Sequence, residues 1–555
     1  MSETAAARAW LAQDPDPETR AELAALVEAA EQGDAAAAAD LHDRFRTRLA
    51  FGTAGLRGEL GAGPNRMNRV LVAQAAAGIA AHLLAEQGPD TPPSVVIGYD
   101  GRRNSRVFAE DSARIFAGAG LRVFLLPRLL PTPVLAFAVR HLGADAGVMV
   151  TASHNPPDDN GYKVYLGGAD GGSQIVPPAD AEIAAQIQRI ADEGDIGRLP
   201  RSDAYEIAPA EVVDAYVAAT AAAGPAPAGA AGLTWVYTAM HGVGAETFAA
   251  VLARAGYPAP VPVAAQIAPD GDFPTVAFPN PEEPGAMDLA FATAREAGAE
   301  LVIAHDPDAD RLAVAVPDPS ADGGWRRLSG NQVGLLLGWR AGRLAEGSPQ
   351  ASLACSLVSS PGLAAVAAHY GLAFHATLTG FKWISRAPGI VYGFEEALGY
   401  LVNPETVRDK DGISAAVAIL QLACEARGRG ASLADLLDEF AQTFGHFASD
   451  QISVRVDDVA VIGRIMAALR ADPPARVGEI GVQRVDDLLE GVDGLPPGDV
   501  LRLWLDDGSR LIVRPSGTEP KLKLYLDVRG ESAGDAAARI TALAAGARAM
   551  LDAVG

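Results

Sequence analysis

Ser153, His154 and Lys163 share one Gly- and Pro-rich segment, and together they could carry out group-transfer chemistry. The segment follows an apolar, strand-like run at residues 146–150, and Pro156 disfavours continuation of a strand because it lacks a backbone donor. A hydroxyl near an imidazole and a cation can act as a nucleophile or carry a phosphate. The same residues could instead cap a turn, and this segment alone favours neither interpretation. An acyl-transfer serine is disfavoured, because the two flanking glycines of a nucleophile elbow are missing.

Three aspartates at alternate positions, Asp306, Asp308 and Asp310, form a second candidate site between two apolar, strand-like runs. In an extended segment their side chains would point the same way, and carboxylates this close repel unless a cation lies between them. Ligands that are all oxygen suit a hard ion such as Mg2+ rather than zinc. An EF-hand is excluded, because Arg311 and Pro317 stand where its glycine and glutamate are needed. A solvated acidic turn is the remaining alternative, and the apolar flanks favour a metal site.

A third candidate site lies between two strand-like runs near the C-terminus and contains Arg514, Ser516, Gly517 and Thr518. Arginine offers a fork of donors, the two hydroxyls add more, and glycine lets backbone N–H groups approach an anion. A plain hairpin loop would explain the glycine and the neighbouring prolines, but not the other three residues. This composition predicts a phosphate-binding loop.

A fourth segment, residues 392–400, holds two adjacent acids, Glu395 and Glu396, in an apolar stretch with flanking glycines. Carboxylates in such a loop could accept hydrogen bonds from sugar hydroxyls. They could equally lie at a helix N-terminus, where acids interact favourably with the helix dipole. Taken alone, this segment leaves both interpretations open.

In their order along the chain, these four segments resemble the α-D-phosphohexomutase superfamily of phosphoglucomutases and phosphomannomutases. The resemblance runs from about Phe51 to about Gly530 and includes smaller matches at residues 52–58, 98–102 and 131–133. The four motifs together are highly specific, since each requires its own combination of residue types.

Two loops resemble one branch of that superfamily, the branch that includes phosphopentomutases and glucose-1,6-bisphosphate synthases. They are residues 379–383 and residues 393–396. Ala397 departs from the pattern of many members, which have serine at this position of the sugar-binding loop. The departure bears on which sugar is bound and leaves the expected mutase chemistry unchanged.

The resemblance implies a phosphosugar mutase that interconverts hexose 1-phosphate and hexose 6-phosphate, with glucose as the expected sugar. Phosphomannomutase and phosphopentomutase activities are the alternatives within the superfamily. Ser153, phosphorylated in the resting enzyme, would give its phosphate to the sugar, and a sugar 1,6-bisphosphate would serve as intermediate and activator. A sugar-phosphate hydrolase or a binding protein is the alternative from another class, and the four-site arrangement favours the mutase.

The expected site residues fall into three sets. Those expected to transfer phosphate, neutralise charge or orient neighbours are Ser153, Arg57, Lys163 and His154. Those expected to hold Mg2+ are the phosphate-bearing Ser153 with Asp306, Asp308 and Asp310. Those expected to bind the sugar phosphate are Arg311, Thr379, Gly380, Lys382, Glu395, Ala397, Arg514, Ser516, Gly517 and Thr518.

The composition indicates a globular protein: 49% of its 555 residues are hydrophobic and 21% are charged. The formal net charge of −24 disfavours nucleic acid and anionic membranes as partners, so small-molecule sugar phosphates would need local cations. Two distant cysteines and an N-terminus unlike a signal peptide predict a cytoplasmic protein. A monomer or a homodimer is expected.

Strand-like and helical segments alternate along most of the chain, which predicts an α/β fold with mixed sheets covered by helices. The resemblance implies four domains around a central cleft, the first three sharing one topology and the fourth a smaller α+β domain. The expected divisions are a helical lead-in at 1–50, a phosphoserine domain at 51–205, a metal-binding domain at 206–328, a sugar-binding domain at 329–448 and a phosphate-binding domain at 449–555.

Overall fold

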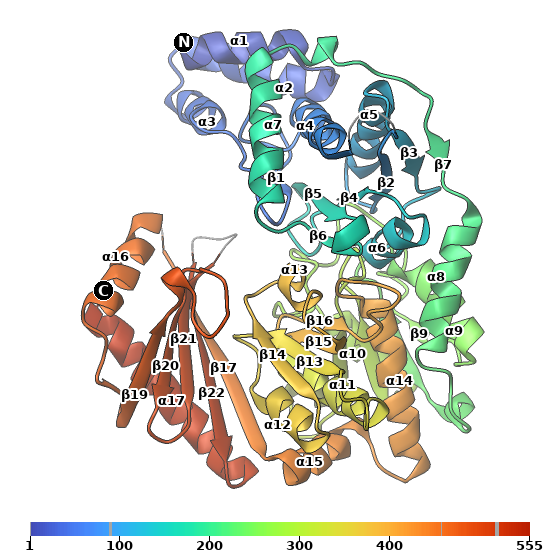
Figure 1. The fold of residues 1–555 in the computed structure, drawn as a ribbon, viewed down its shortest axis with the longest axis vertical. Coiled ribbons are helices and arrows are strands. Elements are labelled where there is room, and N and C mark those ends of the chain that lie inside the picture. The colour runs from blue at the N-terminus through green and yellow to red at the C-terminus, as the bar shows by residue number, and fades with distance from the viewer. Residues whose placement is uncertain (1, 88–90, 457, 517–520, 555) are drawn as a thin grey trace. The chain divides into compact units, whose positions relative to one another are not determined.

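The computed structural model describes residues 2–87, 91–456, 458–516 and 521–554. Residue contacts divide the chain into two compact units, and Figure 1 labels many of their helices and strands. Unit 1 comprises Met1–Leu328 and Gly399–Cys424, and unit 2 comprises Ser329–Leu398 and Glu425–Gly555. Each unit contains its own apolar core.

Unit 1 begins with three helices whose starts are set by capping. The side chains of Ser2, Asp16 and Asp34 accept hydrogen bonds from backbone N–H groups of the first turn that follows each of them. Alanine and glutamate are frequent in these segments and favour helix once it has started. The helices are α1 (Glu3–Gln13), α2 (Pro17–Glu31) and α3 (Ala35–Phe45).

The first sheet of unit 1 is mixed, and its strand order is β1-β5-β4-β2-β3-β7, with β6 paired to β5. β2 is parallel to β3 and β4, whereas β5 is antiparallel to β4. The strands are β1 (Leu56–Glu59), β2 (Ser94–Tyr99), β3 (Arg122–Leu125), β4 (Ala146–Val150), β5 (Asp159–Leu166), β6 (Ser173–Gln174) and β7 (Glu206–Ile207). The helices of this region are α4 (Arg69–Gln87), α5 (Ser105–Gly118), α6 (Thr132–His141) and α7 (Ala179–Glu193), with two 3-10 turns, η1 (Gly168–Asp170) and η2 (Ile196–Arg198).

The second sheet of unit 1 has the strand order β12-β11-β10-β8-β9. Its strands are β8 (Trp235–Thr238), β9 (Val261–Pro262), β10 (Leu301–Ala304), β11 (Ala313–Pro317) and β12 (Trp325–Arg327). The helices are α8 (Ala210–Ala222), α9 (Gly244–Ala255) and α10 (Asp288–Ala297), with η3 (Ala230–Gly232) and η4 (Asp322–Gly324). The later segment of unit 1 contributes β16 (Gly399–Leu401) and the start of α14 (Gly412–Gly428).

Unit 2 contains a parallel trio of strands and an antiparallel six-stranded sheet. The trio has the order β14-β13-β15 and consists of β13 (Ser352–Ser356), β14 (Ala373–Thr377) and β15 (Ile390–Glu395), with α11 (Gly330–Leu344), α12 (Gly362–His369), α13 (Phe381–Ile384) and α15 (Leu433–Phe444). The six-stranded sheet has the order β17-β22-β21-β20-β19-β18 and consists of β17 (His446–Arg455), β18 (Arg476–Val477), β19 (Ile480–Asp487), β20 (Leu501–Leu505), β21 (Arg510–Pro515) and β22 (Lys521–Gly530), with α16 (Val459–Ala471), η5 (Leu488–Glu490) and α17 (Ala533–Val554).

The two sheets of unit 1 share one strand order. Each contains four adjacent strands whose order across the sheet, numbered by their sequence along the chain, is fourth, third, first, second: β5-β4-β2-β3 in one and β11-β10-β8-β9 in the other. The trio β15-β13-β14 of unit 2 repeats the third, first, second part of that order. The expected repetition of one topology is therefore confirmed, and so is the expectation that the last part of the chain is an α+β arrangement.

Apolar side chains are buried between these layers. Fully buried members of the first sheet's core are Val95, Ile97, Phe108, Phe116 and Val148. In unit 2 a separate cluster joins the parallel trio to the six-stranded sheet, and its buried members are Leu357, Val358, Leu488, Val500, Ile512 and Tyr525. The two sheets of unit 2 are thus held together by apolar contact.

One helix of the described chain, α4, contains a window with the length and apolarity of a membrane span, Arg69–Glu86. Within the fold 72% of that window is buried, and the core helix of a sheet domain passes the same test.

Candidate active site

Ser153 lies just after β4, and its backbone has a left-handed φ of 53°. Its hydroxyl Oγ donates a hydrogen bond of 2.8 Å to Oδ2 of Asp306, and Nδ1 of His154 lies 3.2 Å from the same oxygen. Ser153 is only 1% exposed.

The Ser153 loop is held by the guanidinium of Arg102, whose side chain is 1% exposed. Arg102 donates hydrogen bonds to four backbone carbonyls of the loop, with lengths of 2.6 to 3.0 Å. Asp100 completes the support by accepting a hydrogen bond of 2.6 Å from the hydroxyl of Thr151. Because Asp100 and Arg102 directly follow β2, the strand next to β4, these hydrogen bonds fix the position of the Ser153 oxygen relative to the first sheet.

Asp306, Asp308 and Asp310 are all fully buried, between β10 and β11. One carboxylate oxygen from each can be chosen so that all three lie within 4.8 Å of one another. The segment is a turn, with Ala309 at a left-handed φ of 54°, so the predicted extended conformation is wrong. The physical reason is that β10 and β11 are antiparallel neighbours, and the chain between them has to reverse.

Two buried lysines neutralise the aspartates. Nζ of Lys163, which extends from β5, lies 2.7 Å from Oδ2 of both Asp308 and Asp310. Nζ of Lys410 lies 2.5 Å from Oδ2 of Asp310. Lys410 was not among the predicted site residues, and its signal in the sequence is a lysine between two aspartates just before a helix. Oγ1 of Thr132 adds a 2.6 Å hydrogen bond to Oδ2 of Asp308.

The charges of this cluster shift the pKa values of neighbouring carboxyl groups in opposite directions. Burial, with the charges of Asp308 and Asp310, holds the pKa of Asp306 well above its usual value. Burial would also raise the pKa of Asp308, but Lys163 and Lys410 bring it below its usual value. Burial would lower the pKa of Lys163, and the two aspartates raise it above its usual value instead.

The donor set fits a hard divalent cation. Oδ1 of Asp308 and Oδ1 of Asp310 are buried, and neither has a hydrogen-bond partner among the described residues. Buried carboxylate oxygens without a partner are costly unless a cation binds them. All three candidate ligands are oxygens, which suits Mg2+ better than a softer metal. The aspartate triad can therefore hold a metal ion.

Arg57, Arg311 and His154 lie around the same cluster. Nη1 of Arg57 on β1 donates to Oδ1 of Asn155, at 3.1 Å, and Nε of Arg311 lies 3.9 Å from Oδ2 of Asp306. Burial lowers the pKa of His154 well below its usual value, and the cations Arg311 and Arg57 lower it further. The structure thus brings the four residues predicted to act in the transfer, together with Arg311, to one place in unit 1.

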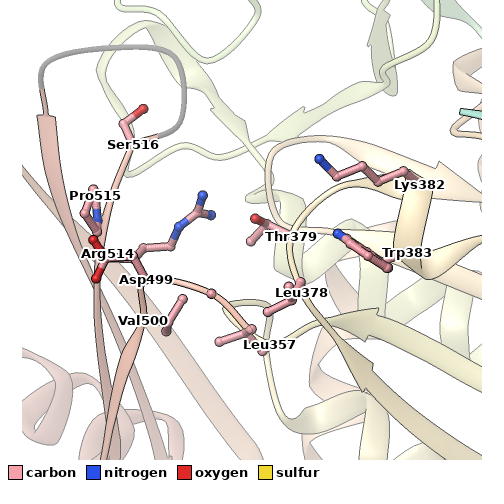
Figure 2. A pocket seen from close by; sticks show the side chains of 11 residues that line it. Leu357, Leu378, Thr379, Lys382, Trp383, Asp499, Val500, Arg514, Pro515 and Ser516 are labelled. Carbon is pink, nitrogen blue, oxygen red and sulfur yellow. The ribbon is translucent and has the colours of Figure 1, made fainter. Parts of the chain in front are cut away.

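In unit 2, a cavity of about 290 Å³ is lined by both the parallel trio's loops and the six-stranded sheet. Figure 2 shows the guanidinium of Arg514 and the hydroxyl of Thr379 pointing toward one another across it, with Lys382 and Ser516 at its edge. The segment 379–383 and the start of the predicted phosphate loop therefore line one cavity, whereas Glu395 and Ala397 are not among its lining residues. Gly517 and Thr518, predicted to extend the phosphate loop, lie outside the described residues.

Glu395 ends β15 and accepts a hydrogen bond of 3.0 Å from the backbone N–H of Gly380. This bond ties two segments that sequence analysis assigned to the sugar, although they are 15 residues apart. The pair of acids follows a strand, so the alternative of a helix N-terminus is not what the structure shows. Ala397 comes two residues later in the turn after that strand.

Glu396 has a polar environment of its own, which the sequence did not predict. Its Oε2 accepts hydrogen bonds from the hydroxyls of Ser356, at 3.1 Å, and Ser359, at 2.9 Å. Burial, together with the charge of Glu395, raises the pKa of Glu396 to about 7. The two adjacent acids thus occupy different environments.

Comparison with known protein families agrees with this geometry. Domains I, II and III of the phosphoglucomutase/phosphomannomutase family, each described as alpha/beta/alpha, match residues 48–193, 214–322 and 329–444. The C-terminal domain of the same family matches residues 452–543. The chain belongs to the phosphoglucomutase/phosphomannomutase family, and it is a phosphosugar mutase, an isomerase that moves a phosphoryl group within its substrate.

Named relatives span several sugars. A Haemophilus influenzae protein named a probable phosphomannomutase is 56% identical and covers 85% of this chain and 94% of its own length. The phosphopentomutase of Mus musculus is 33% identical, covering 94% of this chain and 89% of its own length. A Burkholderia thailandensis structure of a phosphoglucomutase/phosphomannomutase family protein shares the fold, with a TM-score of 0.69, 22% identity, and coverage of 90% and 98% of the two chains.

Proposed function

We propose that this mutase interconverts hexose 1-phosphate and hexose 6-phosphate through a phosphoserine at Ser153, with glucose as the first sugar to test. The observation that carries the proposal is the 2.8 Å hydrogen bond from Ser153 Oγ to Asp306 within a cluster of carboxylates and lysines. A serine oxygen there can carry a phosphoryl group beside cations that offset its charge.

The proposed reaction has two transfers that balance. In the first, the free hydroxyl of the sugar phosphate attacks the phosphorus on Ser153. The bond from phosphorus to serine Oγ breaks, the serine hydroxyl is restored, and a hexose 1,6-bisphosphate results. In the second, Ser153 Oγ attacks the other phosphate of this intermediate, which releases the isomeric monophosphate and restores the phosphoserine.

The residues around Ser153 support both steps. Lys163 and Arg57 bring positive charge to the phosphoryl group, and His154 lies 3.2 Å from Ser153 Oγ, close enough to exchange a proton with it. Asp306, Asp308 and Asp310 would hold Mg2+ with an oxygen of the phosphoserine. When bound, this ion supplies Lewis-acid stabilisation of the developing negative charge.

Recognition of the sugar phosphate is assigned to the cavity of unit 2. Arg514 with Ser516 would bind the phosphate that does not react, because a guanidinium fork matches two phosphate oxygens. Thr379, Lys382 and Glu395 would contact the sugar. We further propose a cytoplasmic enzyme, monomeric or homodimeric, that is activated by a sugar 1,6-bisphosphate.

Mannose and pentose phosphates are the competing substrates, because relatives of this chain are named for each of them. The deciding experiment supplies glucose 1-phosphate, mannose 1-phosphate and ribose 1-phosphate separately, with Mg2+ and a trace of the matching bisphosphate. We expect the fastest isomerisation with glucose 1-phosphate and no accumulation of free phosphate. A higher kcat/KM for mannose or ribose 1-phosphate would overturn the sugar assignment, and release of phosphate without isomerisation would indicate hydrolysis.

A further inference from the structure

A second cluster of metal-ligating side chains lies in unit 1, on elements that the transfer site does not use. His82 and Glu86 stand four residues apart on α4, and Glu182 stands in the first turn of α7. One ligand atom from each of the three lies within 4.8 Å of the others. Residues four apart on a helix share a face, so His82 and Glu86 can bind one ion together.

Helices α4 and α7 are held together tightly, which fixes the geometry of this cluster. Gly78 on α4 lies against the backbone of Ile187 on α7, and a Cβ at Gly78 would come within 2.7 Å of the Ile187 nitrogen. His82 is one turn further along α4, and Glu182 is more than one turn back along α7. Backbones that approach this closely leave the two helices little freedom to move apart.

The imidazole of His82 is the second observation that points to a ligand. His82 is 8% exposed, and its Nδ1 lies 3.8 Å from Oε2 of Glu182, which is too far for a hydrogen bond. Among the described residues, neither ring nitrogen of His82 has a hydrogen-bond partner. A buried imidazole usually has a hydrogen-bond partner. Both glutamates remain accessible to solvent, which leaves an ion a route into the site.

We propose that His82, Glu86 and Glu182 form a zinc-type transition-metal site that joins α4 to α7. One imidazole nitrogen and two carboxylate oxygens are a ligand set that Zn2+ accepts, with water at the fourth position. The nitrogen ligand distinguishes this site from the all-oxygen aspartate triad, which suits Mg2+. The role of the ion is structural, because the three residues lie outside the set that surrounds Ser153.

The test titrates ZnCl2 into the untagged full-length protein by calorimetry, in a buffer with excess Mg2+ so that the aspartate triad is occupied. We expect one equivalent of Zn2+ to bind and to raise the temperature of thermal unfolding. Loss of an outer-shell partner lowers metal affinity by about 10–100-fold, so loss of a direct ligand should lower it at least as much. We expect this loss in His82→Gln, Glu86→Gln and Glu182→Gln.

His42→Gln is the matched control, because His42 also contacts a glutamate of another helix, Glu3, at 2.5 Å, but belongs to no such three-residue cluster of the described chain. Its Zn2+ affinity should equal that of the wild type. Because His82 is nearly buried, the two glutamate variants keep the test valid if His82→Gln folds poorly. Affinity unchanged in both glutamate variants would overturn the proposal. So would loss of the same equivalent in Asp308→Asn, since the ion would then belong to the triad.

Discussion

The buried charges around Ser153 are nearly balanced by their own neighbours. Three aspartates lie against Lys163 and Lys410, which reach them from different segments of the chain. Such a cluster is stable only when each charge has a partner, so the loss of one member leaves another uncompensated. Single substitutions here should therefore change function strongly.

Asp308→Asn tests the metal assignment. One anionic ligand is lost, so the variant should need more Mg2+ for half-maximal rate, and its kcat should fall by roughly 100-fold or more. Mg2+ titrations of the steady-state rate give both numbers. Asp288→Asn, an exposed acid at the start of α10, is the control and should behave as wild type. Rates that respond neither to the Asp308 substitution nor to EDTA would refute the assignment.

Arg514→Ala tests the phosphate-binding role of the cavity in unit 2. Loss of a hydrogen-bonded cation from a phosphate should cost about 1.5–3 kcal/mol, which is roughly 10- to 150-fold in kcat/KM. Arg514→Lys should recover only part of this, because a point charge lacks the fork geometry. Arg484 on β19, outside the cavity lining, supplies the control as Arg484→Ala. Steady-state kinetics within twofold of wild type for Arg514→Ala would show that the loop is structural.

Glu396→Gln tests the polar enclosure through the pH dependence of stability. The folded protein raises the pKa of Glu396 from 4.5 to about 7, so its contribution to stability is complete below pH 4.5 and is lost as the pH rises through 7. A glutamine at position 396 can still accept the serine hydrogen bonds, and because it does not ionise, it does not lose stability as the pH rises. The Glu396 side chain is partly exposed, so solvent screening reduces the effect. The free energy of unfolding of the variant should therefore exceed that of the wild type by about 1–2 kcal/mol at pH 8, and by almost nothing at pH 4.5.

The measurement for Glu396→Gln is the midpoint of thermal unfolding at the two pH values. Glu479→Gln is the control, because the Glu479 side chain is fully exposed and should show no difference at either pH. A variant that is equally destabilised at both pH values would mean that Glu396 is ionised in the folded protein and needed as an anion.

At the scale of elements, β4 and β5 flank the loop that carries Ser153, and the side chain of Arg102 fixes that loop. Arg102 contacts the backbone from Ser153 to Asp159 and thereby sets where the serine oxygen lies. Small misplacements of reacting atoms, of about 1 Å, can slow a reaction by about 100-fold. The support of this loop is therefore a matter of rate as well as of stability.

Arg102→Lys should lower kcat by roughly 10- to 100-fold with a smaller change in KM, because lysine cannot reach four carbonyls at once. The neighbouring Arg103→Lys is the control, since Arg103 is exposed and pairs with Asp158 and Asp272 at the surface. Stopped-flow transfer from a bisphosphate to the serine isolates the step. If Arg102→Lys raises only KM, the arginine acts on binding and not on the position of Ser153.

Periodicity and motif composition predicted the alternation of strands and helices and most residues around Ser153, because each of these is a local property of the chain. Lys410 was not predicted, since its partner Asp310 lies 100 residues away and only the folded chain brings them together. The turn at Ala309 was missed for a similar reason: alternate aspartates suit an extended strand until pairing of β10 with β11 requires a reversal. The separate environment of Glu396 was not predicted, because its partners Ser356 and Ser359 lie 40 and 37 residues away in the sequence.

At the scale of the whole molecule, the proposed function divides its tasks between the two units. Phosphoryl transfer is assigned to unit 1 and recognition of the sugar phosphate to the cavity of unit 2. With a net charge of −24, the protein repels anions on average, so substrate binding depends on these local cations and should weaken as salt screens them. Variants in unit 2 should spare phosphorylation of Ser153 at saturating bisphosphate.

The most direct measurement of the central claim is the intact mass of the protein after incubation with glucose 1,6-bisphosphate, followed by peptide mapping. The wild type should carry one phosphate, located on Ser153. Ser153→Ala should carry none and should lose mutase activity by roughly 10,000-fold or more, while a surface control, Ser202→Ala, keeps both. Full activity of Ser153→Ala, or a phosphate mapped to another residue, would contradict the account.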